Sequence, residues 1–204
     1  MALIDNTYFI NEIRYPNVTK NATLLTAAIN KAEKSVLQML LGYELYSLLI
    51  ADQNEAGAQQ TQRFIDLVDG ADFVIEYRDK EVKQYWNGLK NTDKVSLIAY
   101  YVFIELLTNE ASNYTDVGNV VMKSESGERV SPVDKICEAS ERLADLYGRI
   151  PGEYRHLYNK PIFAGESMAV FNIEPSAYNF LLSNVDDYPE WIFTPYHPVN
   201  RFGI

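Results

Sequence analysis

The feature that most constrains this fold is an apolar segment at residues 92–112, TDKVSLIAYYVFIELLTNEAS. Wound as a helix, it is apolar on two opposite sides, whereas a helix at a protein surface shows one apolar stripe. Its apolar run covers about 13 residues and includes Ser96 and Glu105, so it is too short for a membrane span of roughly 20 residues. The segment therefore predicts a central helix that other elements surround. One face is formed by Val95, Ile98, Ala99, Val102 and Leu106, and the other by Leu97, Tyr100, Tyr101, Ile104 and Leu107.

Helices are predicted on both sides of this central segment. Near the start of the chain, apolar residues recur every three or four positions, which predicts a helix capped by Asn21 or, if it starts earlier, by Thr19. Gly42 is typical of the position after a helix, and Ser131-Pro132 is typical of a helix start. The helices predicted in this way are residues 21–41, 43–51, 62–68, 132–148 and 176–183.

Two segments have the composition of β-strands. Residues 71–88 contain two groups of β-branched and aromatic residues separated by the polar Arg78-Asp79-Lys80, which predicts a β-hairpin that leads into the central helix. Residues 113–130 form a second β-type insertion with a polar tip, and Gly127 supplies its turn. In this second insertion, the residues expected to face Arg129 and Val130 are Val117, Val120, Val121 and Met122.

The predicted fold class is mainly α: a helical bundle with one or two β-hairpin insertions and an extended, aromatic C-terminal tail. Residues 1–18 lack a helical period and form an N-terminal arm that packs on this chain or on a neighbour. Residues 19–163 form the helical core domain, with β-type insertions at 71–88 and 113–130. Residues 164–204 form the tail, which packs on the core or on a neighbour.

The tail combines proline with aromatic residues. It contains four of the eight prolines, which oppose regular packing, yet its aromatic side chains are too apolar for a disordered linker. We therefore predict an extended, docked segment. Its aromatic side chains cover the helices of the same chain or contact another subunit, and both can hold, because tyrosine and tryptophan are typical interface anchors. The residues predicted for an interface are Tyr188, Trp191, Phe193, Tyr196 and Phe202.

Residue types that carry catalysis are sparse and poorly spaced. His156 and His197 have no partner at ligand spacing, and Cys137 has no histidine beside it, so neither a zinc site nor a cysteine nucleophile is expected. The cluster Asp186-Asp187-Tyr188-Pro189-Glu190 is the best candidate for metal binding, but it is more typical of a solvated turn. Glu105 could act as an acid, although such residues usually pair with a base or reach a helix edge. We predict no catalytic, cofactor-binding or metal-ligating residue.

The charge of the chain limits its partners. It has 28 acidic and 18 basic residues, a formal charge of −10, and an acidic chain repels the phosphate backbone of nucleic acids. A single cysteine excludes an internal disulfide, and the opening MALIDNTYFI lacks the basic region of a signal peptide. We therefore expect a cytosolic protein, and direct binding of DNA or RNA is disfavoured except through a local basic patch.

Three segments resemble a known family. Ala32-Glu33-Lys34 through Leu41-Gly42-Tyr43-Glu44-Leu45-Tyr46 resembles the helix–glycine–helix near the start of phage head–tail connector proteins. Trp86-Asn87-Gly88-Leu89-Lys90-Asn91, followed by Ser96-Leu97-Ile98-Ala99-Tyr100-Tyr101-Val102-Phe103, resembles the hairpin and central helix of a connector-like group in phages and prophages of Bacteroidetes. The closing Asn200-Arg201-Phe202-Gly203-Ile204 resembles the C-terminus of that group.

The resemblance implies a small, mainly helical, non-enzymatic adaptor that forms a homo-oligomeric ring between the portal protein and a tail or stopper protein. DNA would pass through such a ring without specific binding, which suits an acidic chain. The implied location is the head–tail junction of the virion, and the cytoplasm of the bacterial host during assembly. Two other classes stay open: a helical scaffold or regulatory protein outside any virus, and a metal-dependent enzyme built on Asp186, Asp187 and Glu190.

Overall fold

The computed structural model describes residues 2–15, 22–77, 80–111, 113–115, 118–120, 132–148 and 175–199. This part of the chain is mainly helical, as predicted. Its α-helices are α1 (Ala22–Ala51), α2 (Gln62–Asp69), α3 (Leu97–Ala111), α4 (Val133–Tyr147) and α5 (Ala177–Ser183). Its strands are β1 (Ala71–Tyr77), β2 (Lys80–Trp86), β3 (Asn113–Thr115) and β4 (Gly118–Val120). Short 3-10 helices are η1 (Asn6–Tyr8), η2 (Asn11–Ile13) and η5 (Val185–Asp187).

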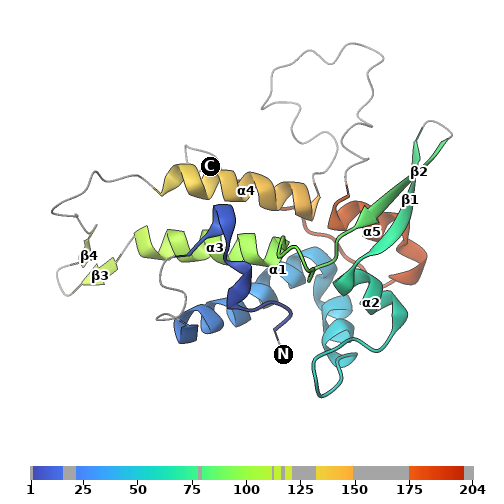
Figure 1. The fold of residues 1–204 in the computed structure, drawn as a ribbon, viewed down its shortest axis with the longest axis horizontal. Coiled ribbons are helices and arrows are strands. Elements are labelled where there is room, and N and C mark those ends of the chain that lie inside the picture. The colour runs from blue at the N-terminus through green and yellow to red at the C-terminus, as the bar shows by residue number, and fades with distance from the viewer. Residues whose placement is uncertain are drawn as a thin grey trace, which may run out of the picture.

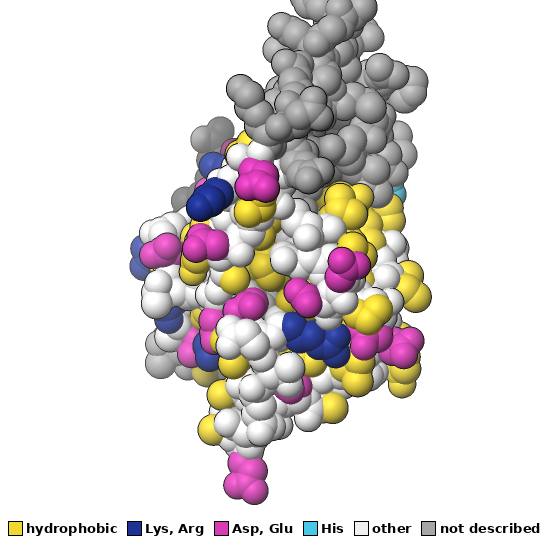
Figure 2. Space-filling model, turned by 90° about the vertical axis from the view of Figure 1, so that its right-hand side faces the viewer, with side chains coloured by type: hydrophobic (Ala, Val, Ile, Leu, Met, Phe, Trp, Pro, Cys, Tyr) yellow, Lys and Arg dark blue, Asp and Glu magenta, His cyan; other side chains and the backbone are white. Residues whose placement is uncertain are grey.

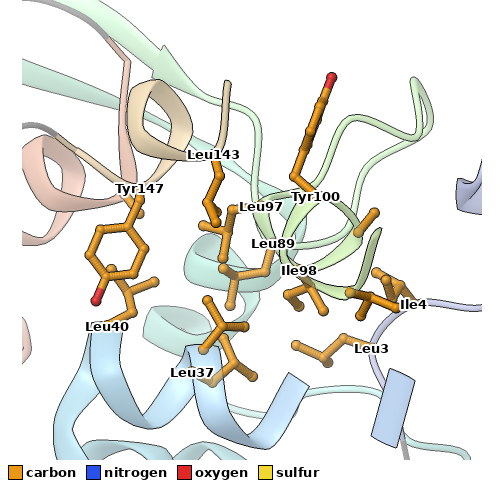
Figure 3. Packing of buried hydrophobic residues seen from close by; sticks show 14 of the residues in the cluster. Leu3, Ile4, Leu37, Leu40, Leu89, Leu97, Ile98, Tyr100, Leu143 and Tyr147 are labelled. Atoms are coloured by element: carbon orange, nitrogen blue, oxygen red, sulfur yellow. The ribbon is translucent and has the colours of Figure 1, made fainter. Parts of the chain in front are cut away.

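Helix α3 lies at the centre, as its apolar sequence predicts. It packs against α1 and against α4, and Figure 1 shows it between these two helices. Apolar side chains from α1, α3, α4 and the start of the chain meet in one core, part of which is shown in Figure 3. None of the helices that the structure describes is long and apolar enough to cross a membrane.

The central helix begins later than predicted, at Leu97 instead of Thr92. The residues before it form a turn, in which the Asn91 side chain accepts a hydrogen bond from the Val95 N–H at 3.1 Å. The Ser96 hydroxyl accepts a hydrogen bond from the backbone N–H two residues later, at 3.2 Å, and so caps the start of the helix. Val95 is 43 % exposed because it lies outside the helix. Side-chain bonds to the nearby backbone compete with helix formation, which shortens the helix relative to the apolar pattern.

Helix α1 bends at Gly42, which adopts φ +79° and ψ 166°. A positive φ is accessible to glycine at little cost and interrupts a helix. The chain therefore forms two helical halves, as residues 21–41 and 43–51 predict. Asn21 and Thr19, the candidate caps, lie outside the described residues.

The hairpin predicted over residues 71–88 is confirmed. Strands β1 and β2 pair antiparallel, from Ala71 opposite Trp86 to Tyr77 opposite Lys80. The base of the hairpin is attached to α2, because the Trp86 Nε1–H donates to the Leu67 carbonyl oxygen at 2.9 Å. The hairpin projects away from the helices towards the upper right in Figure 1.

The second β-type insertion forms a shorter hairpin with a different register. Strands β3 and β4 pair so that Val120 lies opposite Asn113, not opposite Arg129 or Val130 as predicted. This pairing closes a shorter loop than pairing across the polar tip would, and a shorter loop loses less conformational entropy. The other members of the predicted pairing lie outside the described residues: Val117, Val121, Met122, Gly127, Arg129 and Val130.

The start of the chain packs on its own helices. The Tyr8 hydroxyl donates to the Asn91 carbonyl oxygen at 3.1 Å, and the Tyr100 hydroxyl of α3 donates to the Glu12 carboxylate. These contacts place the segment over α1 and α3. Its buried side chains are Leu3, Ile4, Tyr8, Phe9, Ile13 and Tyr15.

The last two helices have the predicted limits. Helix α4 follows Pro132 and ends before Gly148, whereas its predicted cap, Ser131, lies outside the described residues. Helix α5 is capped by Ser176, whose hydroxyl accepts the Asn179 N–H at 3.3 Å. Both helices contact each other, and α5 also contacts β1.

Candidate interaction site in the aromatic tail

Four of the five predicted interface residues lie in residues 188–196, which we call the tail strap. Tyr188 is 2 % exposed and packs in the core, and Phe202 lies outside the described residues. The strap therefore packs on its own chain, whereas its contact with a neighbour stays a prediction. Its half-buried predicted residues are Trp191, Phe193 and Tyr196.

The strap supplies hydrogen-bond donors to the bend of α1. The end of a helix leaves its last carbonyl groups without donors from the same helix. Carbonyl oxygens of the last turn before Gly42 accept hydrogen bonds from the strap instead, two from backbone N–H groups and one from an indole N–H. The pairs are Thr194 N to Met39 O at 2.9 Å, Trp191 Nε1 to Leu40 O at 2.8 Å, and Ile192 N to Leu41 O at 3.3 Å.

Aromatic rings fill the space between the strap, α4 and α5. The Phe193 ring centroid lies 5.3 Å from that of Tyr147 in α4 and 4.7 Å from that of Tyr178 in α5. The Tyr147 hydroxyl donates to the carbonyl oxygen of the next strap residue at 2.6 Å, and the Tyr196 and Ser140 hydroxyls are hydrogen-bonded at 2.8 Å. Burial raises the pKa of Tyr147 and of Tyr196 above its ordinary value.

An arginine of α2 holds the start of the strap. Arg63 Nη1 donates to the Asp187 carbonyl oxygen at 2.8 Å and lies 3.1 Å from a Glu190 carboxylate oxygen. The Tyr188 hydroxyl donates in turn to the Arg63 carbonyl oxygen. A partly exposed ion pair of this kind contributes at most about 1 kcal/mol, so burial of the Tyr188 ring stabilises the attachment more.

The acidic cluster of the tail does not form a metal site in the described part of the chain. Asp186 and Asp187 are exposed, and Glu190 lies against Arg63. Among the residues with described positions, no three His, Cys, Asp or Glu side chains gather so that they could hold a metal ion.

The structure describes three of the four remaining residues considered for chemistry. Cys137 is half-buried in α4, His197 is exposed in the tail, and His156 lies outside the described residues. Glu105 is half-buried in α3 beside Tyr101. Burial, and after it the Glu105 carboxylate, raises the pKa of the Tyr101 hydroxyl.

One buried carboxylate was not predicted from the sequence. Glu33 of α1 is 6 % exposed, and its Oε2 accepts the Leu3 N–H at 2.8 Å. Burial raises the pKa of Glu33 to about 7, although hydrogen bonds from the Leu3 and Ile4 N–H groups favour the charged form. The sequence spacing could have identified this burial. Glu33 lies four residues after Ile29 and four before Leu37, so it shares a helix face with two apolar residues that are both buried.

Replacement of Glu33 by glutamine should remove much of the pH dependence of stability. Because folding raises the pKa of Glu33 from 4.5 to about 7, the folded state binds more protons in this range, and wild-type stability falls as the pH rises through it. Glutamine keeps an oxygen for the Leu3 N–H without a charge, so Glu33→Gln should be about 2 kcal/mol more stable than the wild type near pH 8. Urea unfolding measured from acid to alkaline pH tests this, and parallel stability profiles of the two proteins would contradict it.

Comparison of the chain with protein-family models, curated proteins and solved structures finds no match.

Proposed function

We propose that this chain is a non-enzymatic subunit of a ring that joins the portal protein to the tail of a phage or prophage. In this proposal the core is a helical bundle, and the aromatic tail closes over it. The observation that carries the proposal is where the connector-like segments fall in the fold. Leu41-Gly42-Tyr43 forms the bend of α1, and Trp86-Asn87-Gly88-Leu89 leads from the hairpin towards α3. These are the joints that set the directions of the elements.

The proposed mechanism is assembly without chemistry. The packed helices act as a rigid wedge, and the hairpin and the tail reach neighbouring subunits or the portal. A ring needs a head-to-tail contact, in which two different surfaces of each subunit meet, and a projection on one side of a compact core suits this geometry. Acidic side chains are scattered over the face shown in Figure 2, and the formal charge of −10 would let DNA pass without binding. The ring would lie at the head–tail junction of the virion.

Reconstitution with the portal protein of the same phage or prophage tests the proposal. We expect a complex that contains several copies of this chain, detected by light scattering and seen as an added ring by electron microscopy. The portal protein of an unrelated phage serves as the control. Lack of a complex with the cognate portal at about 10 µM of each protein would exclude an affinity useful for assembly and would contradict the proposal.

A helical scaffold or regulatory protein outside any virus is the rival function. Genes for a portal, a capsid and a tail beside the gene for this chain would support the connector, whereas other neighbours would support the rival. The proposal of a metal-dependent enzyme would need Asp186, Asp187 and Glu190 to converge on one ion. The contact of Glu190 with Arg63 argues against that use.

A further inference from the structure

Among the residues with described positions, the β1–β2 hairpin has two open edges. It forms a two-stranded sheet, so each strand has a described partner on one side only. In the described part of the chain, no backbone hydrogen bond joins the outer edge of either strand to another segment. The pairing runs without a bulge over seven residues of each strand, and neither strand contains proline. Edges of this kind are templates for pairing with a further strand.

One face of the hairpin is attached to the core, and the other carries exposed apolar side chains. On the inner face, the Phe73 and Trp86 rings lie 5.7 Å and 6.1 Å from the Phe180 ring of α5, centroid to centroid. On the outer face, Val74 is 42 % exposed and Tyr85 is 52 % exposed. The anchored inner face holds the hairpin in one orientation, so the geometry of its edges is set before any partner arrives.

The two edges differ in charge. The sequence of β1, ADFVIEY, has two acidic residues and no basic one, whereas that of β2, KEVKQYW, has two basic residues and one acidic residue. Like charges on adjacent strands destabilise their pairing, and opposite charges stabilise it. Pairing of β1 with a second β1 would therefore be disfavoured, whereas pairing of β1 with the β2 of another copy would be favoured. The same charges thus oppose pairing of two β1 edges and favour pairing of a β1 edge with a β2 edge.

We propose that copies of this chain associate through their hairpins, with the β1 edge of one copy paired with the β2 edge of the next. The contact joins two different surfaces, so each copy keeps a free edge for a further neighbour until the assembly closes. Closure into a ring, as opposed to an open filament, rests on the proposed connector function. The partner is a second copy of this chain, and the contact is a backbone ladder with apolar contributions from Val74 and Tyr85.

Charge exchange between the strands tests the pairing. Asp72→Lys and Lys83→Asp, both at exposed positions, should each weaken association of the copies by about tenfold. The double variant should restore association to near the wild-type value, because the opposite charges are exchanged, not removed. Glu44→Lys, at an exposed position of α1, makes the same charge change as Asp72→Lys and should have little effect. Sedimentation velocity would measure association of the protein alone and with the portal.

Hydrogen exchange provides a second readout. In an antiparallel pair, alternate residues direct their N–H groups away from the partner strand. Association should therefore protect every second amide of β1 and β2, with little change in the amides already paired within the hairpin. Equal association of the wild type and both single variants would overturn the proposal, and so would copies that never associate, alone or with the portal.

The two proposals fail in different ways. If Asp72→Lys forms the portal complex as well as the wild type does, hairpin pairing is wrong and the connector function stands. If the copies associate in a charge-dependent manner but never bind the portal, hairpin pairing stands and the connector function is wrong.

Discussion

Replacement of Gly88 by alanine is expected to lower the free energy of unfolding by about 4 kcal/mol or more. Gly88 has φ +82°, and a Cβ atom there would lie 2.4 Å from the Val68 carbonyl oxygen and 2.6 Å from the Asp69 carbonyl carbon. These are backbone atoms, so no side chain can rotate away to make room. The variant would have to separate the end of the hairpin from α2, and Trp86 would lose its place in the core. Urea unfolding followed by circular dichroism measures the loss.

Gly57 is the matched control for the backbone conformation. It has φ +80°, close to the angle of Gly88, but it lies in a loop between α1 and α2 and is flanked by exposed residues. Gly57→Ala should therefore lower the free energy of unfolding by only about 1 kcal/mol, the cost of placing a side chain at positive φ. Equal losses of unfolding free energy in the Gly57 and Gly88 variants would show that the close approach of Gly88 to α2 does not add to the destabilisation.

Replacement of Trp191 by alanine is expected to destabilise the protein by about 3 kcal/mol. The indole N–H donates to the Leu40 carbonyl oxygen at 2.8 Å, and the ring lies 5.7 Å from Tyr178 and 5.9 Å from Phe193. Alanine removes this ring packing and leaves a helix-end carbonyl group without its donor. Urea unfolding measures the change, and hydrogen exchange near the bend of α1 should show where it originates.

Two further variants separate the contributions of Trp191. Trp191→Phe keeps an aromatic ring and loses the donor, so its effect should be about 1 kcal/mol. Ile192→Ala removes a side chain that is 66 % exposed and keeps the backbone N–H that bonds Leu41, so its effect should be below about 1 kcal/mol. If Trp191→Ala unfolded at the wild-type urea concentration, the strap would not stabilise the core, and its aromatic residues would be available for a neighbour.

Local chemistry accounts for the elements that were predicted correctly. Gly42 ends one helix because its backbone reaches a positive φ at little cost, and the dense β-branched and aromatic residues of 71–88 suit paired strands. The start of α3 was predicted five residues too early because apolar spacing continues through Val95, whereas Asn91 and Ser96 bond the backbone in a competing turn. Periodicity detects a helix well but detects such competition poorly.

Contacts between distant segments could not be predicted in this way. Trp191 and Leu40 are 151 positions apart, and Glu33 of α1 is 30 positions from Leu3, which precedes the first helix. The composition of the tail predicted an aromatic segment that docks, but it left open whether the docking surface was this chain or another. The described strap docks on α1, α4 and α5 of its own chain. The predicted role of the strap in an interface depends on the part of each half-buried ring that is still exposed to solvent.

Residue types and local spacings were enough to predict that the chain is mainly helical around one apolar helix, with a hairpin before that helix and an aromatic segment in the tail. Those properties depend on residue types and on spacings of two to four positions, which act within a few turns of chain. The tertiary structure was needed to show which carbonyl groups the tail strap hydrogen-bonds, why Glu33 is buried, and which hairpin edges are unpaired among the described residues. These depend on which distant surfaces meet, and burial and hydrogen bonding across such surfaces are properties of the assembled fold.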